Sequence, residues 1–201
     1  MQISYIEKKG KSKVQITLQN SECFIMNEKE WKTFDLKPGD DIEEPFIIKL
    51  YEEYFLPKAK LKALNLLRSR DHSEKELYQK LRTAGFPDSV IKKTMEYIES
   101  YHYIDDHRLA RNYVTYHGQM KSRKEILYNL SVKGIDIQTM NDEDNFMEEH
   151  DDRKTISKIL FKRWGEEPAP DLKEKERMLR YLARRGFAAQ DIFSVFQDLG
   201  I

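Results

Sequence analysis

Two different spacings of hydrophobic and polar residues divide the chain. In the first fifty-odd residues apolar side chains alternate with polar ones, as in Val14, Ile16 and Leu18, and a period of two is typical of half-buried β-strands. Gly10, within a lysine-rich stretch, predicts a hairpin turn. From about Phe46 onward, apolar residues recur at the three- and four-residue spacing of amphipathic helices. The pattern predicts a mostly α protein with a small β-containing N-terminal region.

The helical part of the chain is predicted to hold nine helices. Their ranges are 58–69, 73–84, 88–101, 105–118, 122–133, 136–148, 152–164, 171–185 and 188–199. Pro57 lies just ahead of the first. Because proline has no N–H and its ring clashes with the preceding turn, we expect a helix to end or kink near Phe55 and a new one to start at Lys58.

Three glycines mark an internal repeat. Gly85, Gly134 and Gly186 each have a leucine four residues earlier and a large apolar residue directly after them, and they lie 49 and 52 residues apart. Each glycine follows a predicted helix, where a residue with positive φ commonly ends the last turn. This period is typical of stacked helical repeats. We therefore predict three tandem three-helix repeats.

Helix-starting residues recur at the same place in the repeats. Ser73 with Glu76, and Ser122 with Glu125, are spaced as capping boxes, whereas the third repeat has Asp171 one turn earlier. The resulting division of the chain is an N-terminal region at 1–57 and repeats at 58–106, 107–150 and 151–201.

Composition narrows the class of protein further. The chain has 201 residues, of which 35% are charged, and its 35 basic residues balance its 35 acidic ones. Zero net charge argues against DNA binding driven mainly by bulk electrostatics. Cys23 is the only cysteine, so no disulfide framework or cysteine-based metal site is expected. No apolar run is long enough for a membrane helix or resembles a signal peptide, which predicts a cytoplasmic protein without membrane contact.

Signals of catalysis or cofactor binding are weak. The sequence has no phosphate-binding loop, dinucleotide-binding glycine motif, serine-hydrolase elbow or zinc-protease motif. The acidic stretch 136–152 lacks the glycine-containing loop of a calcium site, so we interpret it as a solvated face. We predict no catalytic residue, cofactor or metal. Helical spacing also predicts that most of the tyrosines Tyr97, Tyr101, Tyr103, Tyr113 and Tyr116 lie in the core.

Basic residues are the main candidates for contact with a partner or with nucleic acid. They cluster in the second and third repeats: Arg108, Arg111, Lys121, Arg123, Lys124, Lys133, Lys162, Arg163, Arg180, Arg184 and Arg185. Two interpretations stay open at this point. The residues form a surface for nucleic acid or an acidic partner, or they form an ordinary charged face, with cations placed near helix C-termini by the helix dipole.

Several of these motifs together resemble the RecX family of recombination regulators. The resemblance covers roughly residues 59–201 and rests on Arg70-x-x-Ser73-x-x-Glu76-Leu77, on Gly85-Phe86, on Tyr103-Ile104-Asp105-Asp106 and on Leu182 with Gly186-Phe187 and Ile192. It implies a non-enzymatic modulator, built from three-helix units, that binds the RecA filament on single-stranded DNA. The family's implied action is to lower ATPase and strand-exchange activity and to promote filament disassembly. A monomer that meets single-stranded DNA through the filament is the expectation.

Two other classes of function stay open on the residues alone. Capped helix–turn–helix units are also used by regulators that recognise a DNA sequence. A helical adaptor that binds some other protein would show the same repeats and the same charged surface.

Overall fold

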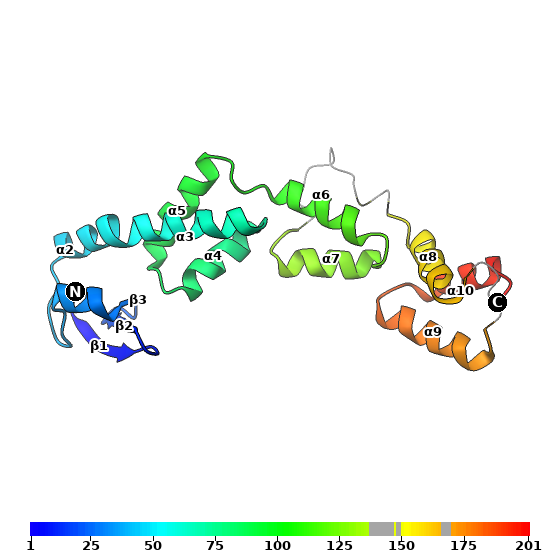
Figure 1. Ribbon diagram of the computed structural model, residues 1–201, viewed down its shortest axis with the longest axis horizontal. Coiled ribbons are helices and arrows are strands. Elements are labelled where there is room, and N and C mark those ends of the chain that lie inside the picture. Colours follow the sequence, from blue (N-terminus) through cyan, green and yellow to red (C-terminus); the bar gives the residue numbers. More distant parts are fainter. Residues whose placement is uncertain (137–146, 148–149, 166–169) are drawn as a thin grey trace. The chain divides into compact units, whose positions relative to one another are not determined.

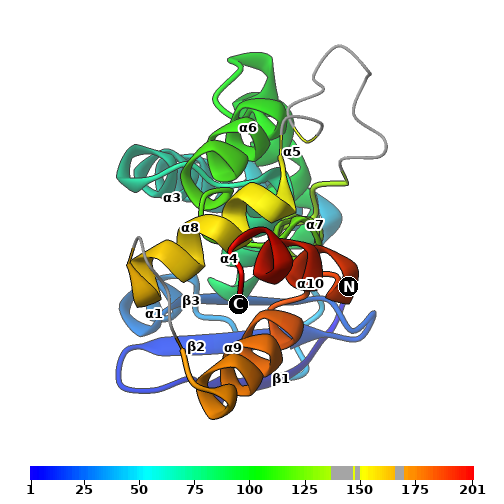
Figure 2. The same cartoon turned by 90° about the vertical axis from the view of Figure 1, so that its right-hand side faces the viewer.

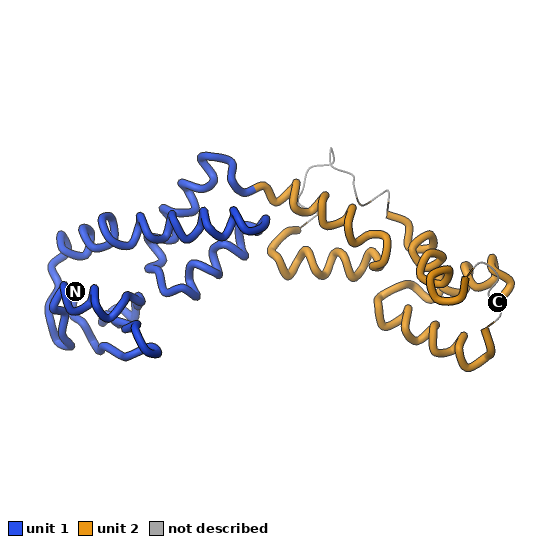
Figure 3. The backbone as a smooth tube through the Cα atoms, in the orientation of Figure 1, with its two compact units in different colours: residues 1–104 blue, residues 105–201 orange. Residues whose placement is uncertain are grey.

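The computed structural model describes residues 1–136, 147, 150–165 and 170–201. They form two compact units, Met1–Ile104 and Asp105–Ile201, which Figure 3 colours separately. Each unit has hydrophobic cores of its own.

Unit 1 begins with the predicted β-containing region. Strands β1 (Ile3–Lys8), β2 (Lys13–Leu18) and β3 (Cys23–Asn27) form an antiparallel sheet in the order β1-β2-β3, followed by the short helix α1 (Glu28–Phe34). The predicted alternation holds on β2, where Val14 and Ile16 are buried. Burying this one face requires a covering layer, which the next helices supply.

One prediction about this region is wrong, because the helix does not end before Pro57. Helix α2 (Glu44–Lys49) continues through a π-helical turn, η1 (Leu50–Phe55), into α3 (Leu56–Ser69), and the helical path in Figure 1 is unbroken. Leu56 donates its N–H to the carbonyl of Tyr51, five residues back. The wide turn lets Pro57 enter the first turn of α3, the place in a helix where a missing N–H costs least.

The first three-helix repeat is packed directly against the sheet. Helices α3, α4 (Glu74–Thr83) and α5 (Asp88–Ser100) enclose a core that includes Leu77, Leu81 and Ile91. A second core lies between the buried face of the sheet and the continuous helix formed by α2, η1 and α3. Val90 of α5 also belongs to this second core. The N-terminal region is therefore part of the body of unit 1.

Unit 2 contains the remaining helices. Helices α6 (Asp106–His117) and α7 (Arg123–Val132) belong to the second repeat, and α8 (Asp152–Trp164), α9 (Leu172–Arg184) and α10 (Ala189–Asp198) form the third. Helix α10 packs against both α8 and α9 (Figure 2). The helix predicted at 136–148 falls almost entirely outside the described residues. In the part of the chain that is described, the fold is mostly α with a small N-terminal sheet, as predicted.

The three repeated glycines end their helices as expected. Gly85, Gly134 and Gly186 have φ values of +88°, +87° and +86°. In each repeat the residue after the glycine donates its N–H to the leucine five residues back, and the glycine N–H donates to the residue after that leucine. This is the Schellman arrangement of a helix C-terminus. The leucines Leu81, Leu130 and Leu182 are completely buried, which confirms the register of the repeat.

The prediction for the tyrosines is wrong for most of them. Tyr101, Tyr103 and Tyr116 are exposed by 58%, 45% and 80%. Helical spacing identified faces, but Tyr101 and Tyr103 lie at or beyond the end of α5, where the spacing rule no longer applies.

Candidate functional site

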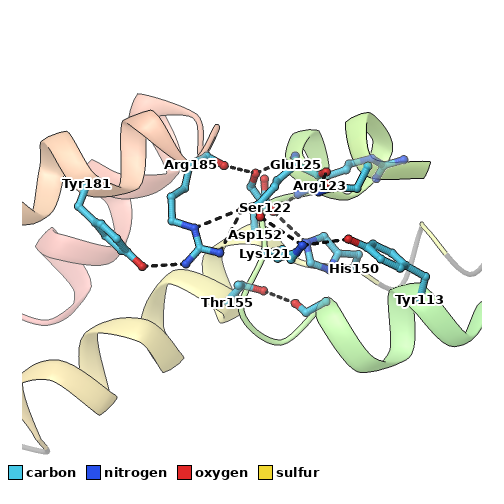
Figure 4. Close-up of polar contacts among 12 residues, drawn as sticks. Tyr113, Lys121, Ser122, Arg123, Glu125, His150, Asp152, Thr155, Tyr181 and Arg185 are labelled. Carbon is cyan, nitrogen blue, oxygen red and sulfur yellow. Dashed lines mark hydrogen bonds and ion pairs between the residues drawn. The ribbon is translucent and has the colours of Figure 1, made fainter. Parts of the chain in front are cut away.

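All of the predicted contact residues lie in unit 2, and three of them take part in one set of contacts. This polar junction joins the second repeat to the third through Lys121, Ser122, Arg123, Glu125, Asp152, Thr155 and Arg185 (Figure 4). It lies where α7 begins, beside the glycine turn that ends α9.

Ser122 is the centre of the polar junction. Its buried hydroxyl accepts the N–H of Glu125 at 3.1 Å and donates to the carbonyl of Arg185 at 2.6 Å. The Glu125 carboxylate does not complete the predicted capping box. It accepts instead from Nε and Nη2 of Arg185, at 3.2 and 3.1 Å. A two-pronged contact with a guanidinium is stronger than a bond to one backbone N–H, and this explains the difference.

Arg123 connects the start of α7 to the first residue of α8 and to Met147 ahead of it. Its backbone N–H donates to Oδ1 of Asp152 at 2.8 Å, and its guanidinium donates to the carbonyl of Met147 at 3.2 Å. Thr155 of α8 adds a bond from Oγ1 to the carbonyl of Gly118, at 3.0 Å. The Arg123–Asp152 and Thr155–Gly118 bonds connect residues on both sides of the stretch 137–149.

Lys121 is held within the second repeat. Its ammonium donates to the hydroxyl of Tyr113 at 2.9 Å and lies 3.4 Å from a Glu125 oxygen. Burial opposes the charge of Lys121, but these two partners outweigh burial and raise its pKa. Lys121, Arg123 and Arg185 therefore have structural roles in unit 2, which the sequence did not indicate.

A second group of the predicted cations surrounds a groove between α8 and α9. This basic groove has a volume of about 550 Å³. Its lining residues are Met120, Ile159, Lys162, Arg163, Trp164, Glu174, Arg177, Met178, Tyr181 and Arg184. Lys162, Arg163 and Arg184 were predicted as contacts. Arg177, Trp164 and Tyr181 were not. The spacing of 177, 181 and 184 on one helix could have revealed Arg177 and Tyr181.

The other predicted contacts are spread over the surface of unit 2. Arg108 and Arg111 are exposed on α6, Lys124 is exposed on α7, and Lys133 is half-buried at the end of α7. Arg180 does not line the basic groove, and its guanidinium lies 3.8 Å from the Glu176 carboxylate. The basic groove is therefore the place where the most predicted cations meet apolar and aromatic walls.

Neither a metal site nor a membrane segment is found among the described residues. They contain no group of three or more histidine, cysteine, aspartate or glutamate side chains able to hold a metal ion. Most of the acidic stretch 136–152 lies outside them. None of their helices has the length and apolar character that crossing a bilayer requires.

Fold and site together define a class: a protein of tandem three-helix repeats with a cation-lined groove. Two family models match the chain, described as the first three-helix domain of RecX over residues 59–97 and the third three-helix domain of RecX over residues 151–196. A regulatory protein RecX from Vibrio vulnificus is 30% identical over 138 residues, which cover 68% of this chain and 89% of the relative. The chain belongs to the RecX family of regulatory proteins.

Further similarities extend along the whole chain. A regulatory protein RecX from Clostridium acetobutylicum is 24% identical over 96% of this chain and 92% of its own length. A crystal structure of a regulatory protein RecX, 21% identical, shares the fold with a TM-score of 0.57 and covers 99% of this chain and 98% of that one. The structure of RecX from Lactobacillus salivarius, 25% identical, has a TM-score of 0.54 and covers 72% of this chain and 96% of its own.

Proposed function

We propose that this chain is a non-enzymatic regulator that binds the RecA filament on single-stranded DNA and lowers its ATPase and strand-exchange activity. Membership of a family of regulatory proteins supports this, and so does the repeat architecture. The observation that carries the proposal is the basic groove, where Lys162, Arg163 and Arg184 surround walls that can also bind an apolar group. We expect a cytoplasmic monomer.

The partner surface proposed for the filament consists of the predicted cations that the polar junction does not use. These are Arg108, Arg111, Lys124, Lys133, Lys162, Arg163, Arg180 and Arg184. Lys121, Arg123 and Arg185 are proposed to act indirectly. Arg185 joins the third repeat to the second through Glu125, whereas the side chains of Lys121 and Arg123 are engaged within the second repeat. The division at 57, 106 and 150 remains our proposal for the boundaries of the repeats.

A RecA–single-stranded DNA ATPase titration tests the proposal. We expect the parent chain to inhibit, and Lys162→Gln with Arg163→Gln to raise the half-inhibiting concentration about 10-fold, as two lost charge contacts would. The matched control is Lys154→Gln with Lys158→Gln, which removes two charges from the same helix outside the basic groove. It should inhibit like the parent.

Two other results would contradict the proposal. Saturable, sequence-dependent binding to duplex DNA without effect on the ATPase would identify a DNA-reading regulator. A chain that affects neither RecA nor DNA would be an adaptor for another protein.

A further inference from the structure

The order of the side chains along one wall of the basic groove indicates the kind of ligand that the groove binds. On α9, residues Arg177, Tyr181 and Arg184 follow one another at spacings of four and three and therefore lie on one face of the helix. At a rise of 1.5 Å per residue, the two arginines are about 10 Å apart along the helix, with the aromatic ring between them. The face presents a cation, a planar ring and a second cation in turn.

The aromatic walls of the groove are held in place by the rest of unit 2. The hydroxyl of Tyr181 accepts from Nη1 of Arg185 at 2.7 Å, and the Arg185 guanidinium lies 5.6 Å from the centre of the Tyr181 ring (Figure 4). The half-buried Trp164 ring is 6.1 Å from the Phe196 ring in the core of the third repeat. Rings fixed in this way lose little conformational freedom when a ligand packs against them.

The charge of the described residues that line the groove is strongly one-sided although the whole chain is neutral. Lys162 and Arg163 in the last turn of α8 line the groove together with Arg177 and Arg184 of α9, and Glu174 is the single acid among these described lining residues. A ligand suited to this site carries negative charges at more than one point and has a planar or apolar group between them.

Four kinds of ligand offer negative charge, and they differ in how the charge is arranged. An acidic peptide would pair with the cations but has no need of two fixed aromatic rings. A free nucleotide has its phosphates at one end only and cannot reach arginines on both sides of Tyr181. In a duplex the bases are stacked inside. An extended single strand alternates phosphate, base and phosphate, and its exposed bases stack on aromatic side chains.

We propose that the basic groove is a subsite for one unstacked base of single-stranded nucleic acid, with the base against Trp164 and Tyr181 and the flanking phosphates on Arg177 and Arg184. This proposal deepens the proposed function and rests on it, because the filament would supply the single strand that the subsite binds. The binding step itself involves this chain and the strand alone.

The chain provides its own optical probe for the test. Trp31 and Trp164 are its only tryptophans, so Trp31→Phe leaves Trp164 as the single source of tryptophan fluorescence. Titration with a 12-residue oligothymidylate should quench this fluorescence saturably. Tyr181→Leu should weaken binding about 10-fold, since stacking on one ring contributes 1–3 kcal/mol, whereas Tyr181→Phe, which keeps the ring and loses the hydroxyl, should bind nearly as the parent does.

Charge variants distinguish binding in the groove from non-specific electrostatic attraction to the surface. Arg184→Gln should lower the slope of log affinity against log salt by about one, as the loss of one phosphate contact does. Lys173→Gln removes a charge from the same helix outside the groove and should leave binding unchanged. Anisotropy of a fluorescein-labelled oligothymidylate gives the same affinities without the Trp31 substitution.

Several results would overturn the subsite. They are absence of quenching, equal binding to duplex or to an oligoglutamate peptide, equal quenching by thymidine triphosphate, or equal weakening by Lys173→Gln and Arg184→Gln. The ATPase titration of the parent keeps the two proposals apart. Inhibition without quenching removes the subsite and leaves the regulator, whereas quenching without inhibition leaves the subsite and removes the regulator.

Discussion

The turns at Gly85 in unit 1 and Gly186 in unit 2 have the same backbone but meet different neighbours. At the first, Ile25 of the edge strand β3 donates its N–H to the Gly85 carbonyl at 2.8 Å. A Cβ added to Gly85 would lie 2.4 Å from Ile25 Cβ. At the second, the Ser122 hydroxyl donates to the carbonyl of Arg185, and a Cβ on Gly186 would lie 3.1 Å from that hydroxyl oxygen.

The difference shows that one helix-ending turn serves two kinds of interface. In both turns a backbone carbonyl at the end of the helix can accept a further hydrogen bond. The donor comes from the module that packs against the turn, which is the sheet in unit 1 and the second repeat in unit 2. In unit 1 the interface continues into the core, since Phe86 packs against the buried face of the sheet. In unit 2 it is built from ion pairs and hydrogen bonds. Opening the first exposes apolar surface to water, whereas opening the second exchanges polar partners for water.

The largest expected effect comes from adding a side chain at Gly85, where the backbone lies closest to Ile25. Gly85→Ala should lower the free energy of unfolding of unit 1 by about 3 kcal/mol, because it combines a strained positive φ with a clash against Ile25. Urea unfolding followed at Trp31 in a Trp164→Phe background measures it. Gly10→Ala is the control, with φ +75° and no atom within 4 Å, and should cost about 1 kcal/mol. Equal losses would mean that the approach of Ile25 does not matter.

A smaller loss is expected at the equivalent turn of unit 2. Gly186→Ala should cost about 2 kcal/mol, because its φ is equally strained but its nearest neighbours are side-chain atoms of Ser122 and Lys124 that can move. Trp164 fluorescence in a Trp31→Phe background follows this unit. Gly200→Ala, with nothing within 4 Å, provides the matched control. A loss as large as that of Gly85→Ala would contradict the comparison of the two interfaces.

The ion pair of the polar junction is expected to contribute less than either turn. Glu125 and Arg185 are exposed by 26% and 24%, so a double-mutant cycle of Glu125→Gln and Arg185→Gln should give a coupling of about 1 kcal/mol that falls with salt. The more exposed pair Glu52–Lys93 of unit 1 serves as control and should couple by about 0.3 kcal/mol. Equal couplings would show that partial burial adds nothing at the junction.

The smallest effect concerns the position before each N-cap serine, where unit 1 has His72 and unit 2 has Lys121. Nδ1 of His72 lies 3.6 Å from the Glu76 carboxylate. Burial, followed by the charge of Arg70, lowers the pKa of His72 below its usual 6.5 against the opposing effect of Glu76. The unfolded chain then takes up a proton first as pH falls. Stability is therefore complete above pH 6.5 and decreases below it.

Thermal unfolding of the parent and of His72→Gln between pH 7.5 and 5 measures this contribution. The parent should lose more stability than the variant on acidification. His117 in unit 2, whose pKa is lowered by burial and by Lys121, acts with the same sign in both proteins, so the difference isolates His72. Identical pH profiles would show that His72 carries no such contribution.

Much of the fold follows from short-range patterns that can be recognised directly in the sequence. The positive φ of the three repeated glycines and the hydrogen bonds back to the leucines at 81, 130 and 182 depend on neighbours within five residues. Asp105, Asp151 and Asp171 cap the helices they precede, because an N-cap side chain needs only the N–H groups two or three residues on. Such interactions have few alternatives, and the sequence alone predicts them.

Only the tertiary structure decided which partner a side chain binds where two possible partners offer interactions of similar free energy. Glu125 could return to Ser122, as Glu76 does to Ser73, but Arg185, 60 residues away, supplies a better partner. The basic groove likewise forms only when α8 and α9 are brought near each other, so that Trp164 and Tyr181 line the same groove. A capping box and an ion pair differ by about 1 kcal/mol, so packing of distant segments determines which one forms.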